Sequence, residues 1–298
     1  MPAIVSHYLL AHRVMETLYT LRPGLDPDRD AFIWGASGPD LFFCHRLLPL
    51  QRERSLSRFG SRMHNEPAHR LLNFLAEYAR VNNDDVVMSY AMGFITHYAF
   101  DATAHPFVLY FAAQMAFRRK NTHESICHNE IEAALDSLFY KRETGRLIST
   151  LRLSDTAPMN REVNKHIACV LCKYMREAYG LNVRFSEIMT AQRDWHNALA
   201  LLNDPSRLRR KIVRLGERAA GLKPMLSPMF REDYPPEEED YANEGGRLWY
   251  AEGEGREHRE SFYSLAQQAQ ALSVSLIMQV ISGKKIAPEQ CEATFSGH

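Results

Sequence analysis

The sequence predicts an all-α protein: a bundle of many helices with a helical C-terminal extension. Apolar residues recur at steps of three and four along most of the 298-residue chain, which is the period of one helix face. Runs that alternate apolar and polar residues, the pattern of half-buried strands, are almost absent. Capping residues and proline-glycine pairs stand where the helical patterns begin and end.

The expected helices follow these signals along the chain. The first carries Leu10, Val14 and Leu18 near one face and ends before Pro23-Gly24. Proline is tolerated in a first turn, so the second helix begins just before Pro67. Asp84 or Asp85 caps a long helix, and His105-Pro106 is expected to end it because proline removes a backbone donor. In order, the expected helices span residues 5–21, 65–81, 86–104, 121–140, 161–179, 186–202, 206–220 and 259–282.

The helical patterns follow one another without a flexible linker, so residues 1–298 are expected to form a single all-α domain. Residues 1–145 form its core, and residues 146–298 form the helical extension. Residues 221–255 interrupt the helices with proline, glycine and acidic side chains, and we expect a solvated acidic loop there. The sequence shows no internal repeat of about 20–50 residues, so a solenoid is not expected.

Composition excludes several classes of protein. The 36 basic and 36 acidic side chains balance, whereas a protein that coats nucleic acid would show a basic excess. No apolar run is long enough to span a membrane, and the first residues lack the pattern of a secretory signal. Five scattered cysteines predict no disulfide framework, so the expected location is the cytoplasm. Thirteen histidines remain to be explained.

The strongest local pattern is a stripe of possible metal ligands on one helix. His97, Asp101 and His105 follow one another at four-residue spacing, which places neighbours about 5–6 Å apart on one face. Imidazole and carboxylate groups suit zinc and related divalent ions. A buried histidine–aspartate hydrogen bond is the competing interpretation of the first two residues.

A second pair stands on the next expected helix, where His128 and Glu132 are again four residues apart. One such pair is a weak signal, since surface pairs of this kind are common. Two pairs on successive helices are more informative, because antiparallel neighbours can bring four ligands together. His123 faces another direction and is expected at the surface.

A third candidate is Asp40, which follows a bend allowed by Gly35, Gly38 and Pro39. Apolar and aromatic neighbours surround it, and a lone carboxylate is costly to bury there without a cation or hydrogen bonds. Asp40 as the cap of a short helix is the alternative. His7 and His64 have no local partner in the sequence.

Taken together and in this order, these elements resemble the zinc-dependent phospholipase C family. The resemblance covers about residues 1–140 and implies an all-α fold shared with the fungal single-strand-specific nucleases, with three metal ions in a cleft. The matching segments are Ser6-His7-Tyr8, Ala11-His12-Arg13, residues 35–40, Met63-His64, residues 97–101, His105-Pro106 and residues 128–132.

The resemblance implies two zinc sites within these segments. His64, His97 and Asp101 would hold one ion, and Asp101 would bridge to a second. The second ion would be held by three residues from two helices: His105, His128 and Glu132. Because the ligand histidines must be neutral, metal affinity is expected to fall on acidification.

The resemblance implies a third site at His7 and Asp40. Members of the family complete this site with the free N-terminal amine of the mature chain. Removal of Met1 before the small residue Pro2 would leave such an amine on Pro2, five residues before His7.

The expected function is metal-dependent hydrolysis of a phosphoester by a phospholipase C-like cluster of two or three zinc ions, or of another divalent metal. Asp40 is the expected general base for the attacking water. Phospholipid at a membrane surface is one expected substrate. Family members that prefer choline lipids carry an aromatic residue after this aspartate, whereas Leu41 follows Asp40 here, so the resemblance does not imply choline lipid.

Two other functions remain open from the sequence. One is a nuclease of the same fold, although no basic strip with interleaved aromatic residues is evident and the basic residues 207–214 are typical of a solvated helix face. Nucleic acid is therefore not an expected partner. The other is a non-catalytic, metal-stabilised helical protein that binds a partner.

Overall fold

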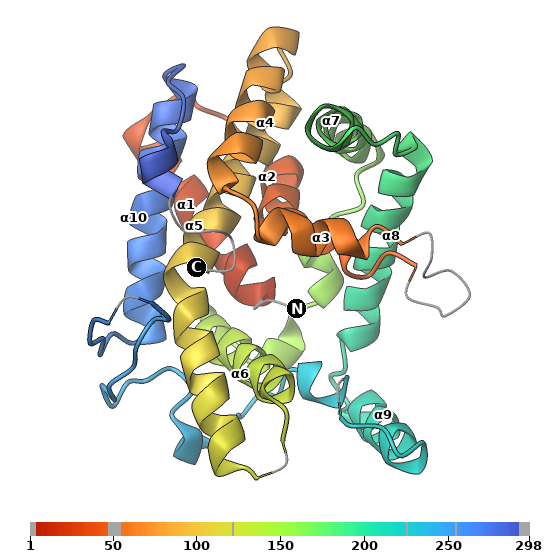
Figure 1. The fold of residues 1–298 in the computed structure, drawn as a ribbon, viewed down its shortest axis with the longest axis vertical. Coiled ribbons are helices and arrows are strands. Elements are labelled where there is room, and N and C mark those ends of the chain that lie inside the picture. The colour runs from red at the N-terminus through yellow and green to blue at the C-terminus, as the bar shows by residue number, and fades with distance from the viewer. Residues whose placement is uncertain (1–3, 47–54, 121, 225, 254, 292–298) are drawn as a thin grey trace.

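A computed structural model describes residues 4–46, 55–120, 122–224, 226–253 and 255–291 (Figure 1). These residues form α-helices and short 3-10 helices, and within them β-type pairing is limited to an isolated antiparallel bridge between Trp249 and His258. The prediction of an all-α fold is confirmed. None of the helices in the described part combines the length and the apolar character needed to cross a membrane. The α-helices are α1 (Ile4–Leu21), α2 (Arg29–Ala36), α3 (Ser57–His64), α4 (Ala68–Asn82), α5 (Asp85–Arg118), α6 (Glu124–Thr144), α7 (Arg161–Tyr179), α8 (Phe185–Leu202), α9 (Leu208–Ala219) and α10 (Phe262–Ile281).

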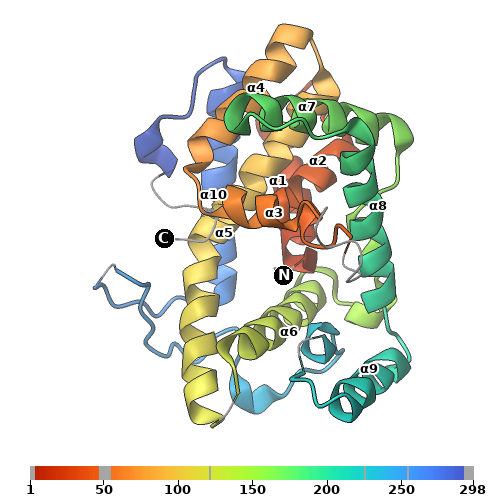
Figure 2. The ribbon, with the colours of Figure 1, turned by 45° about the vertical axis from the view of Figure 1, so that its right-hand side comes forward.

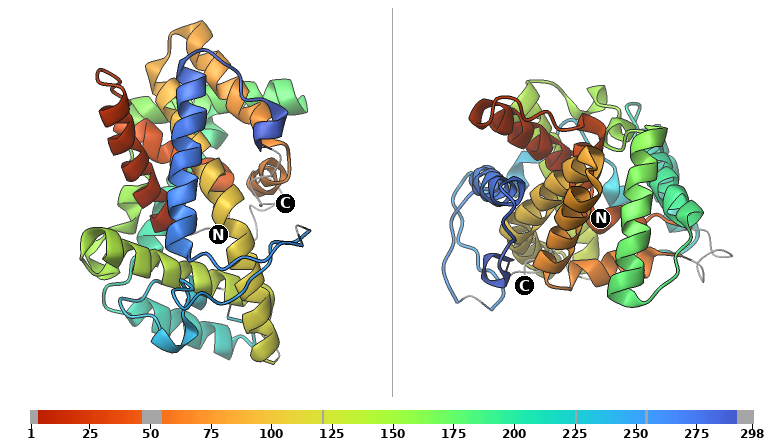
Figure 3. Two further views of the ribbon diagram at one scale, coloured as in Figure 1. Left: turned by 90° about the vertical axis from the view of Figure 1, so that its left-hand side faces the viewer. Right: turned by 90° about the horizontal axis from the view of Figure 1, so that it is seen from above.

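The long helix α5 forms the centre of the molecule. Residues 89–101 of this helix are all buried, and α1, α2, α4, α6 and α10 pack around it. Figure 3 shows α10 running alongside α5 and α1, so a segment near the C-terminus completes the layer around the central helix. A helix that is apolar on every side must be buried in this way.

Helices α2 and α5 cross at unusually short range. A Cβ atom on Gly35 would overlap the carbonyl oxygen of Tyr90, and one on Gly93 would overlap the carbonyl oxygen of Phe32. Two glycines therefore let the two backbones touch. This crossing brings the C-terminal end of α2 against the middle of α5, where the stripe of His97 and Asp101 lies.

The prediction that His105-Pro106 ends the helix is wrong, because α5 continues to Arg118 with Pro106 inside it. Proline removes one backbone hydrogen bond and disfavours a helix interior. Beyond Pro106, however, the helix buries Phe107, Val108, Phe111 and Met115, whose packing offsets that cost.

Other helix bounds differ from the sequence prediction by one to four residues, including both ends of α6, α9 and α10. The helix expected from residue 65 begins at Ala68, because Pro67 is its N-cap, and a separate helix α3 precedes it. Helix α6 begins at Glu124, after His123 as its N-cap. The expected acidic loop at residues 221–255 contains two 3-10 turns, η5 (Ser227–Met229) and η6 (Glu237–Glu239).

Candidate metal centre

The predicted metal ligands lie in three groups in the structure. Within each group, one possible ligand atom from each residue lies within 4.8 Å of the others. His97 belongs to two of the groups, so these two are adjacent. The groups are His7 with His97 and Asp101, Asp40 with His64 and His97, and His105 with His128 and Glu132.

Five elements supply these side chains, and α5 contributes to every group. His7 comes from the first turns of α1, His64 from the end of α3, and His128 and Glu132 from α6. Asp40 lies in the 3-10 helix η1 (Gly38–Phe42), so it is part of a short helix as well as facing the other ligands. The groups therefore form where α1, α6 and η1 meet the central helix, with α3 packed against η1 (Figure 2).

Asp101 is the centre of the first group. One carboxylate oxygen, Oδ1, lies 3.1 Å from Nε2 of His7, and the other, Oδ2, lies 3.1 Å from Nε2 of His97. The two imidazole rings stack with their centroids 4.4 Å apart. All three side chains are almost fully buried. One carboxylate thus joins residues from two helices that are far apart in the chain.

The tautomer of His97 is set by the backbone of α2. Its Nδ1 lies 3.0 Å from the carbonyl oxygen of Ala36, and because a carbonyl only accepts, Nδ1 must carry the proton. In the neutral ring, Nε2 then directs a lone pair at Asp101. Two acceptor atoms at this distance need a positive charge between or beside them, either a proton or a metal ion.

His64 is held in the same way in the second group. Its Nδ1 lies 2.7 Å from the carbonyl oxygen of Gly60, one turn earlier in α3. Its Nε2 lies 3.0 Å from Oδ1 of Asp40 and 4.0 Å from Oδ2 of Asp101. The Asp40 side chain is almost fully buried, and Phe43 stacks on the imidazole with ring centroids 5.3 Å apart.

The third group lies between α5 and α6 and is more exposed. Nε2 of His128 lies 3.0 Å from Oε1 of the buried Glu132, and the rings of His105 and His128 lie edge to face with centroids 5.1 Å apart. His105 is positioned by the continuation of α5 through Pro106, which keeps it on the same helix as His97 and Asp101.

The carboxylates dominate the electrostatics of these groups. Burial would raise the pKa of Asp101, but His97 and His7 hold that pKa well below its usual range. Burial would likewise lower the pKa of His7, yet Asp101 raises it above the usual 6.5. The pKa of His64 is also raised, against burial, by its hydrogen bond and charge interaction with Asp40. Burial would raise the pKa of Glu132, but the charge of His128, its hydrogen bond and the nearby His105 together lower it.

The structure adds contacts around the site that the sequence did not place. Gly38 adopts a positive φ of 52°, and a Cβ atom there would overlap the ring of His97, so glycine is required for the close approach of η1. Trp195 of α8 shares a cavity of about 10 Å³ with His7 and Asp40. The bend at Gly38 was a visible signal, and Trp195 was visible as a bulky side chain that could cover the cleft, but its place beside His7 and Asp40 depends on the fold.

The contacts of the carboxylates overlap with the ligand sets that the resemblance implies but are not identical to them, and Asp101 also lies 4.0 Å from His64 as one of those sets expects. Asp101 lies between His7 and His97, where the expected bridge was toward His105. Asp40 faces His64, where the expected partner was His7. Pro2, the expected source of a ligand amine, lies outside the described residues.

The donor set suits zinc, which binds histidine nitrogen and carboxylate oxygen. The fit of these residues to zinc depends on the tautomers of two histidines. Backbone carbonyls accept hydrogen bonds from Nδ1 of His97 and His64, which leaves each Nε2 directed at a buried carboxylate. Structural partners of this kind commonly orient metal-bound histidines. A family model described as zinc-dependent phospholipase C matches residues 6–181. The chain belongs to the zinc-dependent phospholipase C family.

Membership of the phospholipase C family fits the distribution of the site along the chain. The matched residues include all three ligand groups, whereas α9 and α10 and the acidic loop lie outside the match. No curated protein and no solved structure gives a significant match. The family therefore supports a metal-dependent hydrolase, and the substrate has to be argued from the site.

Proposed function

We propose that the chain hydrolyses a phosphoester with a cluster of two or three zinc ions held by His7, Asp40, His64, His97, Asp101, His105, His128 and Glu132. The observation that carries the proposal is the arrangement around Asp40 and Asp101. Two buried carboxylates meet the Nε2 atoms of three histidines, and backbone carbonyls orient two of those rings. Such a site is strongly cationic when it is filled, which favours a phosphate group.

In this proposal, Asp40 acts on the attacking water. When bound, zinc supplies Lewis acidity, which neutralises phosphate charge and makes water easier to deprotonate. Asp40 lies on the wall of the 10 Å³ cavity beside His7, and about this volume is needed to hold one water molecule. A carboxylate oxygen of Asp40 accepts the proton from that water, and His64 fixes the orientation of the carboxylate through its Nε2 contact.

The first experiment combines elemental analysis of the purified protein with a panel of substrates. The panel holds a nitrophenyl phosphodiester, a phosphomonoester, phosphatidylcholine and single-stranded nucleic acid. We expect two or three zinc ions per chain and hydrolysis of at least one phosphoester that a chelator abolishes. One ion or none, with no hydrolysis, would instead favour the non-catalytic binding protein. Cleavage of nucleic acid alone would favour the nuclease.

The Asp40→Asn variant tests the general base. We expect it to lower turnover by about 100-fold or more, because removal of a positioned base costs roughly that factor. Zinc content and turnover are measured together, so that loss of metal is not mistaken for loss of the base. Asp85→Asn, at the exposed start of α5, is the matched control and should keep both. Full turnover in Asp40→Asn with zinc retained would refute the assignment.

We also propose a reducing compartment such as the cytoplasm as the location. Within the described part of the chain, Cys127, Cys169, Cys172 and Cys291 form no disulfide. Free thiols persist where glutathione and thioredoxin keep cysteines reduced. Thiol titration of protein isolated without reductant tests this, and an oxidised pair would contradict it.

A further inference from the structure

Helix α9 presents an apolar stripe to solvent. Leu208, Ile212 and Leu215 are four and three residues apart, so they lie along one face. Their exposed fractions are 58%, 60% and 68%. Leu222 and Leu226 follow the helix and are exposed as well. Single exposed apolar residues are common on protein surfaces, but a stripe of them indicates an interaction site.

The opposite face of α9 is held against the protein. Glu217 lies about 180° around the helix from Leu208 and is buried. Its Oε1 accepts a hydrogen bond from the backbone N–H of Leu226 at 2.7 Å. Arg210, on the same side, forms an ion pair with Glu232. The stripe therefore points away from the body because polar contacts fix the other side.

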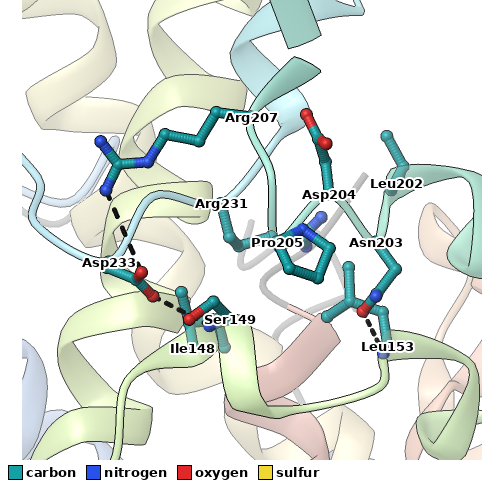
Figure 4. Close-up of a pocket in the computed structure, with 10 residues that line it drawn as sticks. All are labelled: Ile148, Ser149, Leu153, Leu202, Asn203, Asp204, Pro205, Arg207, Arg231 and Asp233. Carbon is teal, nitrogen blue, oxygen red and sulfur yellow. Dashed lines mark hydrogen bonds and ion pairs between the residues drawn. The ribbon is translucent and has the colours of Figure 1, made fainter. Parts of the chain in front are cut away.

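The start of α9 is anchored too, as Figure 4 shows. Nη2 of Arg207 lies 4.0 Å from Oδ2 of Asp233, whose Oδ1 accepts a hydrogen bond from the backbone of Ser149 at 2.9 Å. Asn203, just before the helix, accepts one from the backbone of Leu153 at 3.0 Å. These contacts tie both ends of the segment to the protein, so the outward direction of the stripe is a fixed feature.

Basic side chains flank the stripe. Lys211, Arg214 and Arg218 are exposed along one edge, and Arg209 lies on the other edge. Across the described part of the chain, no ion pair involves Lys211, Arg214 or Arg218. The acidic residue of the helix, Glu217, faces the body. The outward face is therefore apolar in the middle and positive at its edges.

We propose that α9 docks the protein on the surface of an anionic phospholipid membrane. The apolar stripe would enter the interface between headgroups and acyl chains, and the flanking Lys and Arg would contact acidic headgroups. The docking of α9 is independent of the proposed phosphoester hydrolysis. Only the purpose of the docking, to bring the enzyme to a lipid substrate, rests on that proposed function.

Two features favour a membrane over a protein partner. A groove that receives a helix needs a wide part of its circumference, whereas the face of α9 that carries Glu217 and Arg210 is turned to the protein. A single outward stripe suits a flat surface. A second copy of this chain would bring the positive edges of two α9 helices together, which like-charge repulsion opposes. An anionic lipid surface complements both the stripe and its edges.

The first test measures binding of the full chain to vesicles by sedimentation. We expect the chain to bind vesicles of phosphatidylcholine with phosphatidylserine, less well at high salt. The exposed double variant Ile212→Ser/Leu215→Ser should weaken the partition constant by about tenfold or more, because two side chains no longer enter the interface. Val81→Ser is the control, an equally exposed apolar residue on α4 at the other end of the molecule (Figure 1). It should bind as the wild type does.

The second test removes charge. Lys211→Gln/Arg214→Gln should weaken binding to phosphatidylserine vesicles by roughly fivefold for each charge removed. Lys284→Gln/Lys285→Gln, which removes the same charge from the exposed segment after α10, should leave binding unchanged. Equal loss in both double variants would show a general charge effect and overturn the assignment to α9.

Other outcomes separate the two proposals. Absence of vesicle binding, or equal binding of Ile212→Ser/Leu215→Ser and wild type, overturns the docking. Concentration-dependent dimers that this variant abolishes, without vesicle binding, would assign the stripe to a contact between copies. Vesicle binding should survive a chelator, whereas hydrolysis of a soluble nitrophenyl phosphodiester should not. A chain that binds vesicles but hydrolyses no phosphoester refutes the proposed function alone.

Discussion

At the scale of single residues, the site depends on which nitrogen of each histidine carries a proton. The carbonyl oxygens of Ala36 and Gly60 decide this for His97 and His64. Without metal, Asp101 and Asp40 raise the pKa values of His7 and His64 against the effect of burial, which favours a proton on these two imidazoles. Metal and protons therefore compete for the same nitrogen atoms.

This competition predicts opposite effects of pH on the two forms of the protein. His7 and His64 have raised pKa values, so in the metal-free protein they stabilise the fold below about pH 6.5, and this contribution is lost as pH rises through the folded-state pKa. Zinc affinity changes in the other direction. We expect the gain in Tm on adding zinc to increase from about pH 6 to about pH 8.

Thermal unfolding with and without zinc across this pH range checks the prediction. His123→Gln is the control, because His123 is exposed and outside the three groups. Loss of its cap on α6 lowers Tm with and without zinc, so the zinc-induced gain in Tm should depend on pH as in the wild type. In His64→Gln, the zinc-induced gain in Tm should depend less on pH than in the wild type. A zinc-induced gain in Tm that is the same at every pH would contradict competition with protons.

At the scale of helices, the crossing of α2 and α5 positions the Ala36 carbonyl. Gly93→Ala would push a methyl group into the backbone of Phe32, and the nearest atoms there cannot rotate away. We expect the free energy of unfolding to fall by about 2 kcal/mol, as in overpacked cores, and zinc affinity to fall with it because Ala36 moves relative to His97.

Denaturant unfolding and zinc titration measure the two effects. Gly216→Ala, on the exposed side of α9 with open space around it, is the matched control. It should raise the free energy of unfolding by about 0.5–1 kcal/mol, because alanine has the higher helix propensity. A Gly93→Ala variant as stable as the wild type would show that the crossing has room to adjust.

The helices also show how far the sequence could be interpreted. Their existence was predictable because the apolar period is strong, and α7 begins and ends where it was expected. The end of α5 was not predictable from the sequence. The sequence shows the local cost of Pro106, but it does not show that Phe107 and Phe111 are buried by packing against distant segments. The ligand spacing on α5 and α6 was visible in the sequence for the same local reason, whereas the contacts of Ala36 and Trp195 depend on the fold.

At the scale of the whole molecule, one buried ion pair ties the C-terminal half to the metal centre. Asp136 of α6 accepts hydrogen bonds from Arg231 Nε at 2.9 Å and Nη2 at 2.8 Å. It also accepts from the backbone N–H of Ser6 at 2.7 Å, directly before His7. Arg231 lies beyond the residues that match the family, so a residue outside the match holds the start of α1 through Asp136.

Loss of this pair is therefore expected to affect stability and metal binding together. Arg231→Met leaves the Asp136 charge buried without its cation and should lower the free energy of unfolding by about 3 kcal/mol. Zinc content should fall because Ser6 and His7 are no longer held. Lys165→Met, which breaks the exposed pair with Glu162, should change stability by less than about 0.5 kcal/mol. Full zinc content in Arg231→Met would separate this pair from the site.

The continuity of α5 through Pro106 restricts how the length of the chain can vary. His97 and His105 are eight residues apart on one helix, a rise of about 12 Å, and each faces a partner on a different helix. Deleting one residue between them would turn His105 by about 100° and shift it by about 1.5 Å, away from His128 and Glu132. Relatives of this chain should accept insertions at residues 221–255, while the spacing from His97 to His105 stays fixed.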